Sequence, residues 1–294
     1  MQFSIYHTET GKQSFFVPAG QAIVHSRISG VVVYCIRYIT HCCGETDIMG
    51  KQQRKQKRKQ WVWLVPVSVV VILAAAFLIY TGQYYHAGAA AHSMLQSDET
   101  VSVTQTDYGW FFDGPSETDA LIFYPGAKVE TCAYAPLLHS VAEKGMDVCL
   151  VKMPFRLAFF GINKANRVMK VHDYEHWYIG GHSLGGAMAA YYAAGHAAQL
   201  TGVILLAAYP TKPLADNLRV ITIYGSEDGV LNMKKVAEGA KYMPENHMEF
   251  VIQGGNHAQF GDYGEQKGDG KAAISAQEQQ HQAEELILKN SLRG

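Results

Sequence analysis

The chain has 294 residues, of which 48% are hydrophobic and 17% are charged, and its formal net charge is −1. This length accommodates one large or two small globular domains. A nucleic-acid-binding surface needs a clear excess of lysine and arginine, so the near-neutral charge predicts no nucleic-acid partner.

The first 48 residues show no clear periodicity. They contain a short β-like run, Val31–Tyr34, and the cysteines Cys35, Cys42 and Cys43. These cysteines lack the paired spacing of a metal site, so we expect no bound metal. A natural start for the protein lies at Met49, and residues 1–48 are interpreted as a mis-assigned start or a poorly ordered tail.

A basic cluster precedes a long apolar segment. Six of the nine residues 51–59 are lysine or arginine, and residues 61–80 then carry no charge. Twenty residues in a helix span a hydrocarbon core of roughly 30 Å. Trp61 and Tyr80 lie at its two ends, where interfacial aromatic residues are typical. We predict a transmembrane helix at 61–80 with a basic flank at 49–60.

The positive-inside rule gives this helix a direction. It places residues 49–60 in the cytoplasm and the chain after residue 80 outside it, as a single-pass protein of the cell membrane. The small residues at 87–91 resemble a signal-peptidase site, so a cleaved signal peptide is the alternative to an uncleaved signal anchor. The apolar segment exceeds the usual 7–15 residues of a signal peptide, which favours the anchor. Residues 81–99 are interpreted as a linker to a domain at 100–294.

The domain alternates apolar runs with amphipathic segments. We expect strands at 101–112, 120–124, 147–151, 177–180, 203–207, 219–224 and 248–252, and helices at 130–144, 162–171, 184–198, 231–241 and 271–290. This alternation predicts an α/β fold, with a mostly parallel sheet covered by helices on both faces. Eleven residues separate the strands at 203–207 and 219–224. They leave no room for a cap domain, which speaks against a lipase with a large lid.

The most informative motif is Gly181-His182-Ser183-Leu184-Gly185. It lies between the apolar run at 177–180 and an alanine-rich helical segment, which is the strand, sharp turn and helix of a nucleophile elbow. The turn strains the serine and leaves no room for side chains at Gly181 and Gly185. Ser183 is therefore the candidate nucleophile.

Two downstream turns carry candidate partners for this serine. The strand at 219–224 ends in a turn with Glu227 and Asp228, and the strand at 248–252 leads into a glycine-rich loop with His257. Serine, acid and histidine in this order form a catalytic triad, in which histidine is the base and the acid orients it. Asp228 is preferred and Glu227 is the alternative; Asp228-Gly229 is also an ordinary turn dipeptide.

A tetrahedral intermediate also needs backbone N–H donors. We expect one from Leu184, directly after the nucleophile. The second is expected from Ala127, in the loop that follows the strand at 120–124 and opens with Pro125-Gly126.

Together these segments resemble α/β-hydrolases, and most of all the small dienelactone-hydrolase-like serine hydrolases. The resemblance covers residues 120–263 and is carried by Tyr124–Ala127, Val151–Phe155, Gly181–Gly186, Tyr224–Gly229 and Gly255–Phe260. It implies hydrolysis of a carboxylic ester through an acyl-enzyme, without a cofactor. The chain departs from the family pattern in two ways. First, Pro125-Gly126 stands where many members have a His-Gly pair. Second, dienelactone hydrolases themselves use a cysteine nucleophile, so Ser183 speaks against that substrate.

Several alternatives stay open at this point. An acyltransferase would use the same triad, and a non-catalytic binding module could keep the fold, although the intact order of serine, acid and histidine argues against it. Cys132 and Cys149 could form a disulfide or remain two buried thiols. Phe155, Leu157, Phe159 and Phe160 could form an apolar wall beside the serine or belong to the core.

Overall fold

The computed structural model describes residues 3–7, 14–18 and 51–292. They fall into two compact units, Met1–Ile72 and Leu73–Gly294. In the first unit, strands β1 (Phe3–His7) and β2 (Ser14–Pro18) pair antiparallel. The β-like run at 31–34 and the three N-terminal cysteines lie outside the described residues.

Helix α2 (Lys51–Gly82) contains the predicted membrane span. Its segment Leu64–Gly82 is long and apolar enough to cross a membrane. Ser68 and Thr81 each donate their hydroxyl to a backbone carbonyl one turn earlier, at 2.8 and 3.0 Å. The hydroxyls of Ser68 and Thr81 are thus satisfied within the helix, as a hydrocarbon environment requires. The expected helix is confirmed, whereas insertion in a membrane stays a prediction.

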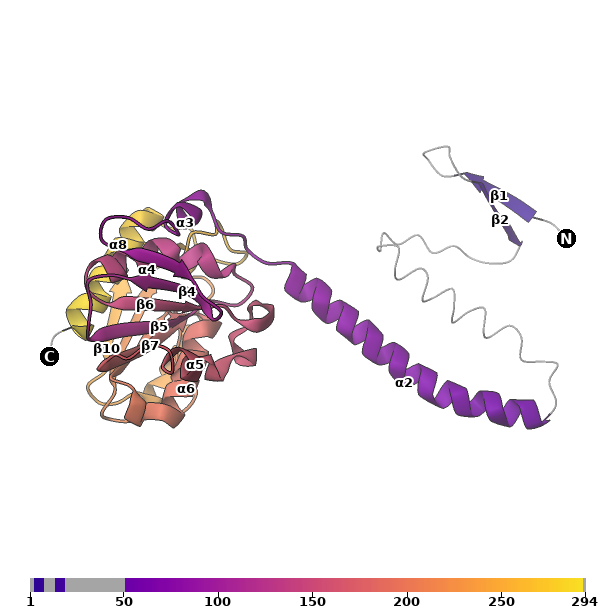
Figure 1. Cartoon of the computed structure of the whole chain (residues 1–294). Helices are drawn as coiled ribbons and strands as arrows, with labels where there is room; N and C mark the ends of the chain where they lie inside the picture. The colour runs from indigo at the N-terminus through magenta and orange to yellow at the C-terminus, as the bar shows by residue number, and fades with distance from the viewer. Residues whose placement is uncertain (1–2, 8–13, 19–50, 293–294) are drawn as a thin grey trace. The chain divides into compact units, whose positions relative to one another are not determined.

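The second unit is built on an eight-stranded sheet of order β10-β9-β8-β7-β5-β6-β4-β3 (Figure 1). The strands are β3 (Ser102–Gln105), β4 (Gly109–Asp113), β5 (Asp119–Tyr124), β6 (Asp147–Val151), β7 (His176–His182), β8 (Gly202–Leu206), β9 (Arg219–Gly225) and β10 (Met248–Ile252). Strands β5 to β10 are parallel, and β4 and β3 add antiparallel pairs at one edge. The predicted, mostly parallel sheet is confirmed.

Helices cover both faces of this sheet, because its central strands are apolar on both sides. Every residue of β6 and β8 is buried. One face packs against α4 (Ala135–Glu143) and α8 (Ala276–Ser291), and the other against α5 (Ala165–Val168) and α6 (Leu184–His196) (Figure 1). A short helix, α7 (Met233–Gly239), follows β9. The expected three-layer α/β arrangement is confirmed.

The strand expected at 101–112 is instead a hairpin of β3 and β4. The Thr106 N–H donates to the Gly109 carbonyl at 2.9 Å, which closes the turn. Gly109 has φ 151°, a backbone conformation in the region that favours glycine. A single apolar run therefore gives two strands because of one turn-forming glycine.

Two helices are shorter than expected. At 162–171 the structure has a 3₁₀ turn, Ile162–Lys164, and the single turn α5. The buried Tyr124 hydroxyl donates to the Ile162 carbonyl and accepts from the Ala165 N–H, which fixes this segment as two turns. Helix α8 starts at Ala276 rather than 271, because the Ser275 side chain caps it by accepting from the Glu278 N–H at 3.1 Å.

The segment expected as a linker makes specific contacts with the second unit. Tyr85 pairs with Val129 in a parallel bridge. The carbonyl and the carboxylate of Asp262 accept hydrogen bonds from the backbone of Gly88 and Ala91, at 2.7 and 2.8 Å. Helix α3 (Ala89–Ser93) begins directly after Gly88 and contains Ala91. Residues 85–91 are therefore packed onto the core of the second unit.

Cys132 and Cys149 are both buried and free. Burial raises the pKa of the Cys132 thiol to about 11 and that of Cys149 to about 12. Both thiols are therefore neutral at physiological pH and poor nucleophiles. Of the two possibilities left open by the sequence, the structure has the buried thiols.

The strand order also creates a switch point between β5 and β7. The chain runs from β5 to β6 on one side, and then returns to place β7 on the other side of β5. Open α/β sheets bind ligands at the carboxyl ends of the strands at such a point. Ala127 and Ser183 follow these two neighbouring strands.

Candidate active site

Ser183 lies in a strained turn between β7 and α6. Its φ and ψ are 53° and −123°, a conformation that a residue with a side chain rarely adopts. The turn is possible because its neighbours lack Cβ atoms. A Cβ on Gly181 would lie 2.4 Å from the Tyr124 carbonyl oxygen, and one on Gly185 would lie 2.1 Å from the same atom. The backbone has the geometry of a nucleophile elbow.

Two backbone N–H groups are free near this turn. The first hydrogen bond of α6 runs from the Ala187 N–H to the Ser183 carbonyl at 3.0 Å, so the Leu184 N–H has no helical acceptor. In the loop after β5, the Lys128 N–H donates to the Arg156 carbonyl at 2.9 Å. Among the described residues the amides of Leu184 and Ala127 find no hydrogen-bond acceptor. Both remain available to a ligand.

A buried tyrosine holds the loop of Ala127 against the elbow. The Tyr134 hydroxyl accepts from the Gly126 N–H at 3.0 Å and lies 2.8 Å from His182 Nδ1. A Cβ on Gly126 would lie 2.7 Å from that hydroxyl oxygen and 2.9 Å from Nδ1. Glycine is required here by the close approach of two fixed side chains.

His182 takes part in this packing as a neutral group. Burial and the neighbouring His257 hold the pKa of His182 well below its usual value. The Tyr134 hydroxyl can therefore donate to an unprotonated Nδ1. The sequence-based interpretation of His182 as a locally packed residue agrees with this contact.

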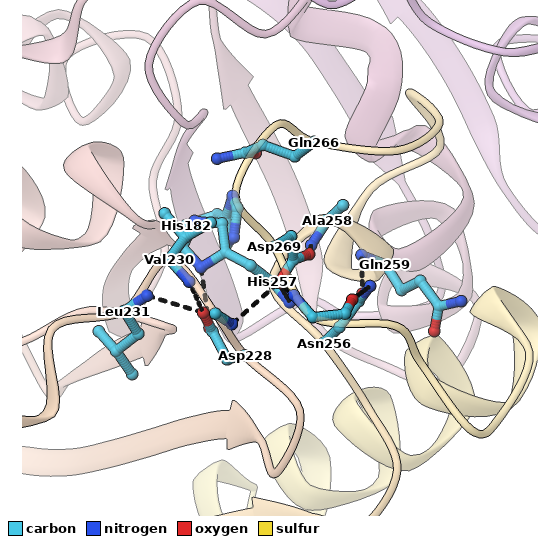
Figure 2. A network of polar contacts seen from close by, with 12 residues as sticks. His182, Asp228, Val230, Leu231, Asn256, His257, Ala258, Gln259, Gln266 and Asp269 are labelled. Atoms are coloured by element: carbon cyan, nitrogen blue, oxygen red, sulfur yellow. Dashed lines mark hydrogen bonds and ion pairs between the residues drawn. The ribbon is translucent and has the colours of Figure 1, made fainter.

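Asp228 and His257 are brought together as expected (Figure 2). His257 Nδ1 lies 2.8 Å from Asp228 Oδ2, and both side chains are 2% exposed. The other oxygen, Oδ1, accepts from the backbone N–H groups of Val230 and Leu231 at 2.9 and 2.7 Å. These bonds fix the direction of the carboxylate toward the imidazole.

Glu227, the alternative acid, points elsewhere. Its carboxylate accepts a hydrogen bond from the exposed Ser226 hydroxyl at 2.9 Å. Of the two acids in this turn, Asp228 is the one in contact with His257.

The second ring nitrogen of His257 is left without a partner. Nε2 is buried and makes no hydrogen bond with any described residue, Ser183 included. The His257 ring packs at 4.4 Å, centroid to centroid, on His182, the residue directly before the serine (Figure 2). Catalytic hydrogen bonds are often long in a free enzyme and tighten once substrate is bound. A buried ring nitrogen without a partner suits a proton acceptor.

Two residues that the sequence analysis did not single out hold the histidine loop. Asp269 accepts from the N–H groups of Gly229, His257, Ala258 and Gly270, at 2.8–3.2 Å. Gln279 of α8 is fully buried, accepts from the Asn256 N–H and donates to its carbonyl, at 2.9 and 2.7 Å. A glutamine on the buried face of α8, in line with Ala283 and Ile287, was a signal in the sequence. Asp269, between two glycines of a loop, had none.

A model of the alpha/beta hydrolase family matches residues 120–281, more than half of the chain. The chain belongs to this family. The match includes Ser183, Asp228 and His257, and also Asp269 and Gln279. The protein is thus an alpha/beta hydrolase, and the fold class and family expected from the sequence are confirmed.

Solved structures similar to this hydrolase include TT1662 from Thermus thermophilus (14% identity, TM-score 0.47, covering 66% of this chain and 99% of that one). Est1E from Butyrivibrio proteoclasticus has 13% identity and a TM-score of 0.46, with 66% and 100% covered. A dienelactone hydrolase from Anabaena variabilis has 13% identity and a TM-score of 0.44, with 66% and 98% covered. No curated protein sequence matches the chain.

Proposed function

We propose that this protein is a membrane-anchored serine hydrolase that cleaves carboxylic esters through an acyl-enzyme. The observation that carries the proposal is the buried Asp228–His257 pair, at the same sheet edge as a serine with φ 53° in a strand–turn–helix. In this assignment Ser183 is the nucleophile, His257 the general base and Asp228 its orienting acid.

The reaction then proceeds in two halves. Ser183 Oγ attacks the ester carbonyl carbon while His257 Nε2 takes its proton, and the positive imidazole is stabilised by Asp228 through Nδ1. Collapse of the tetrahedral intermediate breaks the bond to the alcohol, which leaves with the proton from Nε2. Water, deprotonated by His257 in the same way, releases the acid and restores Ser183.

The negative oxygen of each intermediate needs donors that are already in position. The free N–H groups of Leu184 and Ala127 are assigned to this role. Loss of one such donor costs about 10²–10³ in rate in a related chemistry. The N-terminal end of α6 contributes further positive potential at the same place.

The anchor in this proposal is the helix at 61–80. Leu64 and Leu73 within it are 57% and 63% exposed, and exposure of so many large apolar side chains to water is unfavourable. A bilayer would cover them. With the basic flank in the cytoplasm, the catalytic unit lies outside, in a single-pass arrangement at the cell membrane.

Hydrolysis of p-nitrophenyl acetate by the full chain in detergent tests the chemistry. We expect release of p-nitrophenol by the wild type and none above the solvent rate for Ser183→Ala. Equal rates for the two would overturn the assignment of Ser183.

Protease added to intact cells tests the topology. The expected result is loss of the catalytic unit and survival of a small membrane stub. A catalytic unit protected until the membrane is permeabilised would contradict the proposed orientation, and its release into the medium without protease would indicate a cleaved signal peptide.

A further inference from the structure

Three aromatic side chains are exposed on the loop that follows β6. Phe155, Phe159 and Phe160 are 47%, 46% and 48% exposed. The ring of Phe160 lies 5.5 Å from that of Phe155 and 4.2 Å from that of Phe159, between centroids. We call these three residues the aromatic patch. Scattered apolar residues are ordinary on a protein surface, whereas contiguous large ones indicate a contact surface.

The aromatic patch is continuous with the end of the apolar helix. Phe77 of α2 packs edge-on against Phe155 and Phe160, with ring centroids 5.1 and 5.8 Å apart. Phe77 belongs to the segment Leu64–Gly82 and to the same compact unit as the patch. If that segment crosses a membrane, its C-terminal end lies at the membrane surface, and the patch lies at the same depth.

Two cations flank the patch in the arrangement expected at such a surface. Lys128 Nζ lies 4.2 Å above the Tyr80 ring, and the Arg156 guanidinium carbon lies 3.4 Å above the Tyr84 ring. Tyrosine rings with lysine and arginine next to them are typical of the headgroup region, where the cations meet lipid phosphates. The occupant of the patch that fits this chemistry is a phospholipid bilayer.

The backbone of the patch is strained. Phe155 and Arg156 are consecutive residues in the left-handed region, with φ 53° and 58°. Neither is a glycine, so this turn is unfavourable by itself. Strained backbone of this kind clusters at functional contacts.

The same loop is joined to the active site. The Arg156 carbonyl accepts from the Lys128 N–H at 2.9 Å, and the Lys128 carbonyl accepts from the Tyr85 N–H at 2.7 Å. Lys128 directly follows Ala127, whose amide is assigned to the oxyanion hole. Helix α6, which begins after Ser183, packs against the turn Ala158–Phe160. Backbone hydrogen bonds therefore connect the loop of the aromatic patch, the chain at Tyr85 and the loop of Ala127.

We infer that the aromatic patch inserts into the membrane surface and that the active site takes its substrate from the bilayer, as an acyl ester of a membrane lipid. This inference rests on the proposed function of the same site. Because the anchor already holds the site at the interface, no lid has to open.

Tryptophan fluorescence of the full chain tests the insertion. Phe159→Trp is reconstituted in vesicles of phosphatidylcholine and phosphatidylglycerol (3:1), with or without phosphatidylcholine brominated near the headgroup end of its chains. The signal of the wild type, which has four tryptophans, is subtracted. Val171→Trp is the matched control. Val171 is 63% exposed and lies in the loop before β7, at the amino ends of the strands, whereas the patch follows the carboxyl end of β6. We expect quenching at 159 at least threefold stronger than at 171; equal quenching would overturn the insertion.

Two esters with one leaving group test the substrate class. 4-Methylumbelliferyl oleate carried in the same vesicles reports hydrolysis at the bilayer, and 4-methylumbelliferyl acetate reports hydrolysis from water. The ratio of the oleate rate to the acetate rate should fall at least tenfold in Phe159→Ser/Phe160→Ser and stay unchanged in Val171→Ser. An unchanged ratio in the double variant would overturn the inference even if both esters are cleaved. Absence of acetate hydrolysis by the wild type would instead contradict the proposed function.

Discussion

The carboxylate of Asp269 accepts a hydrogen bond from the backbone N–H of His257 at 3.2 Å. The same carboxylate accepts from Ala258 and Gly270 in this part of the chain, and from Gly229 in the turn after Asp228. Asp269 therefore joins the loop that holds the proposed base to the turn that holds its orienting acid. In the proposed mechanism it is a positioning residue, without contact to the reacting atoms.

Replacing Asp269 by asparagine removes one of its two acceptor oxygens. The new amide N–H₂ would instead face backbone N–H groups, which are also donors. We expect Asp269→Asn to destabilise the fold by about 1–3 kcal/mol. Well below the unfolding temperature, kcat for p-nitrophenyl acetate should fall about tenfold with little change in KM, because the His257–Asp228 pair is misplaced. Asp173→Asn, at an exposed position, is the control. An unchanged kcat in folded Asp269→Asn would rule out the positioning role.

Two glycine-to-alanine variants, one in the loop of Ala127 and one in α6, test whether the Ala127 amide takes part in the reaction. Gly126→Ala places a Cβ against Tyr134 and His182, whereas a Cβ on Gly195 of α6 meets nothing within 4 Å. We expect Gly126→Ala to lower kcat by about 10- to 1,000-fold, since the Ala127 amide moves. Gly195→Ala should leave kcat unchanged and stabilise the helix by about 0.5–1 kcal/mol. Equal kcat values for the two variants would contradict the assignment of the Ala127 amide to the oxyanion hole.

The two acids of the 225–229 turn should differ strongly. Asp228→Asn leaves His257 Nδ1 facing an amide and favours the wrong tautomer, so kcat should drop by about 10³–10⁴. Glu227→Gln changes only a contact with the exposed Ser226 hydroxyl and should retain nearly full activity. If both variants are inactive to the same degree in the ester assay, the acids are wrongly assigned.

Asp147 gives the fold a specific pH dependence. Its side chain is buried, accepts from the Gly114 N–H at 2.8 Å and from the Tyr174 hydroxyl, and burial raises the pKa of Asp147 to about 6. The folded state then binds more protons than the unfolded state between the usual carboxyl pKa near 4 and this raised pKa, so stability from this group falls as pH rises through that window.

Asp147→Asn cannot titrate and should lack this slope. From denaturant unfolding at pH 4 and pH 7, we expect the wild type to lose on the order of 1 kcal/mol relative to the variant as pH rises. A relative gain of the wild type with rising pH would contradict the raised pKa.

The sequence predicted the elements that depend on uninterrupted patterns. The strands from β5 to β10, the elbow at Ser183 and the turns with Asp228 and His257 follow from apolar runs that end in glycine-rich turns. The segment at 101–112 was predicted as one strand, and it forms two, β3 and β4, because of a single turn at Gly109. The helix predicted at 162–171 is shorter in the structure, because the hydroxyl of Tyr124, on the distant strand β5, bonds to Ile162 and Ala165.

The support of the candidate site was harder to predict, because it comes from groups remote in the chain. Asp269 lies 41 residues after Asp228 and Tyr134 lies 48 residues before His182, so no local spacing reveals their hydrogen bonds. The helical spacing around Gln279 indicates that it is buried, but not that it bonds to Asn256. The contacts of residues 85–91 with the rest of the second unit are of the same kind. Long-range backbone hydrogen bonds to Lys128 and Asp262 hold a segment whose own composition indicates a linker.

Labelling by a fluorophosphonate probe tests the central claim most directly, because the probe reacts only with a serine that a base has activated. The full chain in detergent is treated with the probe, digested and examined by tandem mass spectrometry. We expect one modified peptide with the phosphonate on Ser183, labelling that is absent in Ser183→Ala, and labelling at least about 100-fold slower in His257→Ala. Undiminished labelling of Ser183→Ala, or a phosphonate on another serine of the wild type, would contradict the account.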